Sequence, residues 1–277
     1  MRATSLENSG CRLTTAGRTD KFVSASAQII NFVHSRPVSP HDLLSELRQT
    51  EPVLAGRLAF HACARVPRQF NARACATWRR YLYLVPLTLQ DEGTIAPASS
   101  PARLPVDTEF VDRVFRSLEG LPLPYNAFAV GEDRKMGEGM LDVCTLYRAR
   151  AYEVQPAGPA TAPFLCVELV GSRFLRRMVR LLVATAVREG LKVPAGERDV
   201  DCIQKICMAN DRTLRAMPFP GSGLCLSGVG FDLRQLSFWK QQKKVDLQAL
   251  QAQYAREDEV AAAAAVGREG QLPVAGD

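Results

Sequence analysis

The sequence predicts an α+β protein, and three observations support this class. Segments of alternating apolar and polar residues recur along the 277-residue chain, and helices with their own start signals separate them. The hydrophobic fraction of 47% is ordinary for a globular protein and allows a sizeable core. The order of the segments suggests two β-α-β-like halves.

In the first half, we expect strands at Cys11–Thr15 and Gln28–Val33, on either side of a loop at Gly17–Ala25. Ser39 followed by Pro40 is a typical helix start, because serine caps the first turn and proline suits its first position. This helix would turn three leucines inward, namely Leu43, Leu44 and Leu47. Strand-like alternation returns in two later segments, Arg57–Val66 and Trp78–Val85.

In the second half, Asp107 is expected to cap a helix whose apolar side chains share one face, namely Phe110, Val111, Val114, Phe115 and Leu118. Strands are expected at Leu146–Val154 and Phe164–Val170. The remaining expected elements are a helix from Phe174 to about Glu189 ended by Gly190, a helix at Val200–Met208 and a strand at Leu224–Phe231.

Composition divides the chain into four regions. A segment at 88–106 rich in proline, serine and alanine predicts a loop or linker between an N-terminal half at 1–87 and a C-terminal half at 107–235. Residues 236–277 are rich in glutamine and alanine and are expected to form a low-complexity tail.

Charge and the positions of cysteine and histidine limit the classes of function. A net charge of +6 is compatible with a nucleic-acid partner without demonstrating one. The eight cysteines are scattered and the three histidines all lie in the first quarter of the chain, so no metal site is expected. The sequence has no apolar run long enough for a membrane span, and secretion is not expected because the first residues lack an apolar signal core.

Three stretches combine residues that suit RNA chemistry. Gly17–Ala25 holds an acid beside an arginine, Phe70–Tyr83 interleaves arginines with aromatics, and Arg173–Leu182 carries four arginines at helical spacing that would form a basic stripe. On a strand, Arg79, Tyr81 and Tyr83 would share one face. Each stretch also has a simpler interpretation, as a solvated turn, as sheet packing, or as the solvated face of a helix.

Taken together, these stretches resemble the motifs of the TruA-type tRNA pseudouridine synthases. Gly17–Ala25 resembles their G-R-T-D-x-G-V-x-A loop, Phe70–Tyr83 their F-x-A-R-x-x-A-x-x-R-x-Y-x-Y segment, and Phe174–Leu182 their F-L-x-x-M-V-R helix. Asp211–Leu214 and Gly223–Leu226 resemble the closing D-R and G-L-x-L patterns. The similarity runs from about residue 11 to residue 232.

The resemblance implies two ferredoxin-like halves that form a mixed or antiparallel sheet, with helices on one side and an RNA-binding cleft. It implies that Asp20 is the nucleophile, that Tyr81 stacks on the target base and assists proton removal, and that Arg180 pairs with Asp20. The RNA would be held by arginines, namely Arg18, Arg73, Arg79, Arg173, Arg176 and Arg177. This chemistry needs no metal or cofactor.

The implied function is isomerisation of uridine to pseudouridine in the anticodon stem-loop of tRNA, at about positions 38–40, after the base has left its stack. An intracellular homodimer is implied, in the cytoplasm, the nucleus or an organelle. Two departures favour an alternative, a catalytically impaired TruA-like RNA-binding protein of a ribosomal or organellar RNA assembly. Phe22 stands where the family has glycine, and a positive φ there would strain the turn. The family's first strand and helix have no counterpart before the loop.

Overall fold

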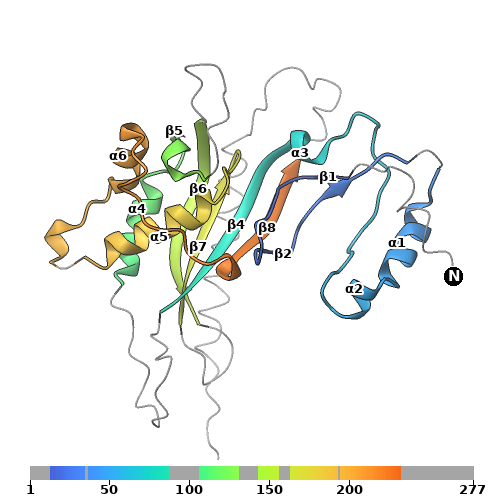
Figure 1. The fold of residues 1–277 in the computed structure, drawn as a ribbon, viewed down its shortest axis with the longest axis horizontal. Coiled ribbons are helices and arrows are strands. Elements are labelled where there is room, and N and C mark those ends of the chain that lie inside the picture. The colour runs from blue at the N-terminus through green and yellow to red at the C-terminus, as the bar shows by residue number, and fades with distance from the viewer. Residues whose placement is uncertain are drawn as a thin grey trace, which may run out of the picture. The chain divides into compact units, whose positions relative to one another are not determined.

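The computed structural model describes residues 13–34, 37–87, 106–130, 143–155, 163–192 and 194–231, and Figure 1 shows their elements. They form two compact units, each discontinuous in sequence. The described part of the first unit comprises residues 13–18, 28–34, 37–76 and 231. The second unit contains the remaining described residues. Apart from Val106, the predicted linker lies outside the described residues, as does the predicted tail, so those boundaries stay predictions.

The first unit contains a small two-stranded sheet and three short helices. Strands β1 (Thr14–Thr15) and β3 (Ile30–Asn31) pair antiparallel, and both are shorter than the strands predicted there. The helices are α1 (Pro40–Arg48), α2 (Glu51–Leu54) and α3 (Ala72–Cys75).

The predicted start of α1 is confirmed. The hydroxyl of Ser39 accepts a hydrogen bond from the backbone N–H of Asp42, and proline occupies the first turn. Only Leu43 of the three expected leucines is buried, while the other two are half-buried.

The strand predicted at Arg57–Val66 is wrong. The segment has no strand and most of its side chains are exposed. Alternation indicates only that a segment is suited to a sheet, and a strand also needs a neighbour with which to exchange backbone hydrogen bonds.

The second unit is built on a six-stranded sheet with the strand order β2-β8-β4-β7-β6-β5. These strands are β2 (Ser24–Ala25), β4 (Ala76–Pro86), β5 (Pro122–Pro124), β6 (Val143–Val154), β7 (Phe164–Gly171) and β8 (Leu224–Phe231). β2 pairs parallel with β8, whereas β4–β7, β7–β6 and β6–β5 are antiparallel. The mixed sheet together with the helices confirms the α+β class.

Helices α4 (Thr108–Arg116), α5 (Met178–Gly190) and α6 (Cys202–Ala209) cover the sheet on one side (Figure 1). The carboxylate of Asp107 accepts from the N–H of Phe110 at 2.9 Å, as the predicted cap requires. All five apolar side chains expected on the inner face of α4 are buried. Short 3-10 turns lie at Tyr125–Phe128, Ala195–Glu197 and Gly221–Gly223.

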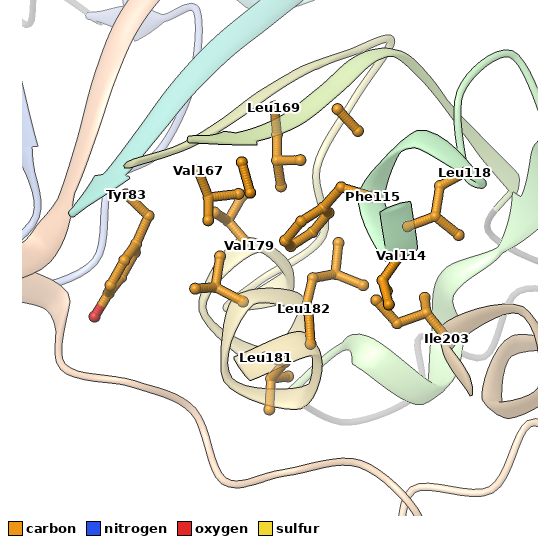
Figure 2. Close-up of a cluster of buried hydrophobic side chains, with 14 of the residues drawn as sticks. Tyr83, Val114, Phe115, Leu118, Val167, Leu169, Val179, Leu181, Leu182 and Ile203 are labelled. Atoms are coloured by element: carbon orange, nitrogen blue, oxygen red, sulfur yellow. The ribbon is translucent and has the colours of Figure 1, made fainter. Parts of the chain in front are cut away.

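The core of this unit lies between the sheet and these helices. Figure 2 shows Phe115 from α4 and Leu182 from α5 facing Val167 and Leu169 on β7. Removing such side chains from water is the main favourable contribution to folding. None of the described helices is long and apolar enough to span a membrane.

The opposite face of the sheet carries a buried acid. Glu168 on β7 is 2% exposed, and its carboxylate oxygens lie 2.5 Å from Nε of Arg80 on β4 and 2.8 Å from Nε of Arg148 on β6. One carboxylate therefore joins three adjacent strands, and its charge is compensated by two guanidinium groups.

The predicted helix start at Phe174 is wrong, because α5 begins at Met178. Arg177, just before it, has a φ of 61°, a left-handed conformation that does not continue a right-handed helix. The basic stripe expected over Arg173–Arg180 is therefore also wrong, since only Arg180 lies on the helix.

Candidate active site

An ion pair joins two segments that are 160 positions apart in the sequence. Nη1 of Arg180, in the first turn of α5, lies 3.3 Å from Oδ2 of Asp20. The side chain of Arg180 is 13% exposed and that of Asp20 is 29% exposed, so the pair sits at the protein surface without being fully solvated. Nε of Arg180 donates to the carbonyl oxygen of Phe219 at 2.5 Å, which fixes the guanidinium in place.

Asp20 begins a tight turn. The N–H of Val23 donates to the carbonyl oxygen of Asp20 at 3.1 Å, and Phe22, the third residue of the turn, has a φ of 69°. Lys21 has no positive φ, so this is the pattern of a type II turn, in which glycine is preferred at the third position. Phe22 therefore has the positive φ that, as expected from the sequence, would strain a phenylalanine.

The turn is held on several sides. Val23 packs against the core of the second unit, and β2 directly after it pairs with β8 through Ser24 and Cys225. A Cβ on Gly221 would lie 2.8 Å from the carbonyl oxygen of Lys21, so the turn backbone and this glycine are in close contact.

Tyr81 lies beside the ion pair and points into the protein from β4. It is 7% exposed, and its ring meets the ring of Phe174 edge-on at a centroid distance of 5.0 Å. Burial raises the pKa of Tyr81 to about 12, with Arg79 opposing the rise and Asp20 adding to it. The phenol therefore keeps its proton at neutral pH and is not an anionic base there.

Tyr83 belongs to the same site, a role that the sequence interpretation did not assign to it. Its hydroxyl donates to the carbonyl oxygen of Pro220 at 2.6 Å, and its ring lies 6.0 Å from that of Phe219. Burial raises the pKa of Tyr83 to about 12, and nearby Arg180 opposes the rise. The segment Phe219–Gly221 thus contacts Arg180, Tyr83 and the Asp20 turn, mostly through its backbone. Backbone contacts leave no signal in residue identity, which is why sequence motifs could not reveal them.

The six arginines expected to bind RNA differ in exposure. Arg79 is 8% exposed, and its Nη1 donates a hydrogen bond to the carbonyl oxygen of Ser172, so its guanidinium is used inside the protein. As predicted, Arg79, Tyr81 and Tyr83 share one face of β4, because all three are buried and the residues between them are half-buried. The others are exposed or half-buried, with Arg18 and Arg73 in the first unit and Arg173, Arg176 and Arg177 in the second. Their contacts with RNA stay predictions.

Two non-glycine residues with a positive φ lie close in the sequence to the residues of the ion pair. Of the three described non-glycine residues with positive φ, Phe22 follows Asp20 by two positions and Arg177 precedes Arg180 by three. The third, Asn210, caps the end of α6, where asparagine is common. Strain of this kind often marks functional sites. Within the described ranges, no group of three or more histidine, cysteine, aspartate or glutamate side chains is arranged to hold a metal ion.

Comparison with known proteins gives consistent matches. A family model described as tRNA pseudouridine synthase matches residues 133–232. The chain is 30% identical over 227 residues to tRNA pseudouridine synthase A of Roseiflexus sp. strain RS-1. The aligned region covers 79% of this chain and 75% of that protein. The enzyme of the same name from Ligilactobacillus salivarius is 27% identical over 78% of each chain. That of Lacticaseibacillus casei is 30% identical over 77% of this chain and 80% of its own.

Proposed function

The chain belongs to the tRNA pseudouridine synthase A (TruA) family, and on that premise we propose that it isomerises uridine to pseudouridine in tRNA. Pseudouridine synthases are isomerases, so the substrate and the product are the same nucleotide with a different glycosidic bond. The finer proposal is that the target lies in the anticodon stem-loop, at about positions 38–40, where the base can leave its stack.

The observation that carries this proposal is the 3.3 Å contact between the carboxylate of Asp20 and the guanidinium of Arg180, beside the buried ring of Tyr81. All three groups belong to the same compact unit. They come from a loop, a strand and a helix that are distant in the sequence. A functional site assembled by the fold has this arrangement, whereas a solvated turn would place Asp20 beside neither group.

In the proposed reaction, the carboxylate of Asp20 acts as the nucleophile that allows the base to leave C1′. The N1–C1′ bond breaks, the base rotates, a C5–C1′ bond forms, and the carboxylate is released. C5 loses a proton and N1 gains one, so the reaction consumes no oxidant, reductant or co-reactant. Because Tyr81 is neutral at pH 7, it would take part by hydrogen bonding and by contact with the base rather than as a phenolate.

The remaining proposals concern the partner and the setting. A net charge of +6 and the exposed Arg18, Arg73, Arg173 and Arg176 suit a tRNA backbone. An intracellular location and a homodimer are proposed from family membership.

The test is to incubate the protein with unmodified tRNA transcripts and to map pseudouridine by chemical derivatisation and primer extension. The wild-type protein should form product in the anticodon stem-loop. Asp20→Asn should retain RNA binding and lose roughly a thousandfold in single-turnover rate, because the amide is not a nucleophile. Asp201→Asn, at an exposed aspartate whose side chain makes no capping bond, is the matched control and should react normally.

Two results would change the assignment. If the wild-type protein binds tRNA but forms no pseudouridine, the alternative of a catalytically impaired RNA-binding protein is favoured. If Asp20→Asn is as fast as the wild-type protein, Asp20 is not the nucleophile.

A further inference from the structure

Phe22 combines two unfavourable features on the active-site turn. Its backbone has a φ of 69°, which phenylalanine rarely adopts, and its side chain is 73% exposed. An exposed ring gains little from burial, so packing against the described residues does not offset the strain. Among the described residues, Lys21 places its Nζ over the ring, 4.9 Å from the ring centroid.

The surroundings hold the backbone of Phe22 in this conformation. The turn is tied at its start by the ion pair of Asp20 with Arg180, and at its end by the packing of the half-buried Val23 against the core. The close approach of Gly221 to the carbonyl oxygen of Lys21 also restricts the movement of the turn. A strained residue persists only where its environment determines the conformation in this way.

We propose that Phe22 is a stacking site for a nucleobase of the RNA substrate, adjacent to the uridine that reaches Asp20. This inference rests on the proposed function and extends it to a residue that departs from the family motif. Phe22 and Asp20 belong to one four-residue turn, whose ends lie within about 7 Å of each other. A nucleotide flanking the target is therefore within reach of the ring.

The chemistry favours a base over an apolar protein partner. An exposed phenyl ring next to an ammonium group offers a π-face for stacking and a cation for the adjoining phosphate. The neighbouring carboxylate of Asp20 would be costly to bury under an apolar protein surface.

The test measures RNA affinity with three substitutions at the same position. Phe22→Trp keeps an aromatic face, Phe22→Leu keeps apolar bulk and the strained backbone without a π-face, and Phe22→Gly removes both the side chain and the strain. We expect Trp to bind like the wild-type protein, and Leu and Gly to bind about tenfold more weakly. Met208→Ala, at another exposed apolar side chain, is the matched control and should not change affinity.

The binding probe is an anticodon stem-loop oligoribonucleotide with 2-aminopurine at a position flanking the target uridine. Stacking should quench its fluorescence when residue 22 is phenylalanine or tryptophan, and the quenching should be lost in Phe22→Leu. The measurement is made in the Asp20→Asn background, so that it does not depend on turnover.

The two proposals can fail separately. Weaker binding by Phe22→Leu and Phe22→Gly, with no pseudouridine formed by the wild-type protein, would support the stacking site and overturn the proposed activity. Equal or tighter binding by Phe22→Gly, with an active wild-type protein, would overturn the stacking site and show that the ring is an obstacle.

Discussion

At Phe22, a side chain that the family motif does not contain occupies the position where a turn needs a positive φ. The left-handed conformation costs about 1–2 kcal/mol for a residue with a Cβ, and a ring that is 73% exposed does not repay it by burial. Asp20, two residues earlier, nonetheless keeps its ion pair with Arg180. The substitution therefore changes the surface beside the site without removing the charged pair.

Tyr81 shows how burial sets the protonation state of a site residue. Its pKa is raised from 10.0 to about 12, which favours the neutral phenol in the folded state. The contribution of the neutral Tyr81 to the free energy of unfolding is fully present below about pH 10 and is lost as the pH rises from about 10 toward about 12. Stability should therefore fall over that range.

Tyr81→Phe should reduce that fall, because the ring and its contact with Phe174 remain while the ionisable hydroxyl is gone. We expect the difference in pH dependence to reach up to about 2–3 kcal/mol. Urea unfolding followed by circular dichroism from neutral to alkaline pH measures it. Identical pH dependence in the two proteins would mean that Tyr81 does not titrate abnormally.

At the level of elements, the site depends on close contact between two loops. The Asp20 turn and the Gly221–Gly223 3-10 turn approach so closely that a Cβ on Gly221 would meet the carbonyl oxygen of Lys21 at 2.8 Å. Both partners in this contact are backbone, so neither can move aside by changing a rotamer.

Gly221→Ala should therefore displace the Asp20 turn and lower the rate of pseudouridine formation by about tenfold to a hundredfold, because small displacements of reacting groups are costly. Gly196→Ala is the control, since an added Cβ there meets nothing within 4 Å. Single-turnover rates of both variants give the comparison. A normal rate in Gly221→Ala would show that the turn tolerates the shift.

At the level of the whole molecule, the central strands share one buried charge. Glu168 contacts Arg80 and Arg148, and so links β4, β7 and β6 on the face opposite the helices. Breaking a buried ion pair costs far more than breaking an exposed one, because the remaining charges stay desolvated.

Glu168→Gln should lower the free energy of unfolding by about 3–5 kcal/mol. Glu51→Gln removes an equivalent but exposed partner of Arg57 and should cost less than about 1 kcal/mol. Thermal and urea denaturation of the two variants test the difference. A cost for Glu168→Gln as small as that for Glu51→Gln would show that the central charge is not important for stability.

Elements with local signals could be predicted before the fold was known. Asp107 and the apolar face behind it predicted α4, and alternation predicted β4 and β8, because capping and period depend on residues a few positions apart. The motifs also predicted Asp20, Tyr81 and Arg180 as site residues, and their catalytic roles stay predictions.

The pairing of segments and the contacts that hold the site depend on the folded chain as a whole. Apolar and polar residues alternate along Arg57–Val66, but the segment forms no strand. Apolar residues recur at helical spacing on both sides of Arg177, but its left-handed conformation means that α5 begins only after it. The carbonyl groups of Phe219 and Pro220 hold Arg180 and Tyr83. Such contacts join residues far apart in the chain through backbone atoms that every residue possesses, so no local pattern encodes them.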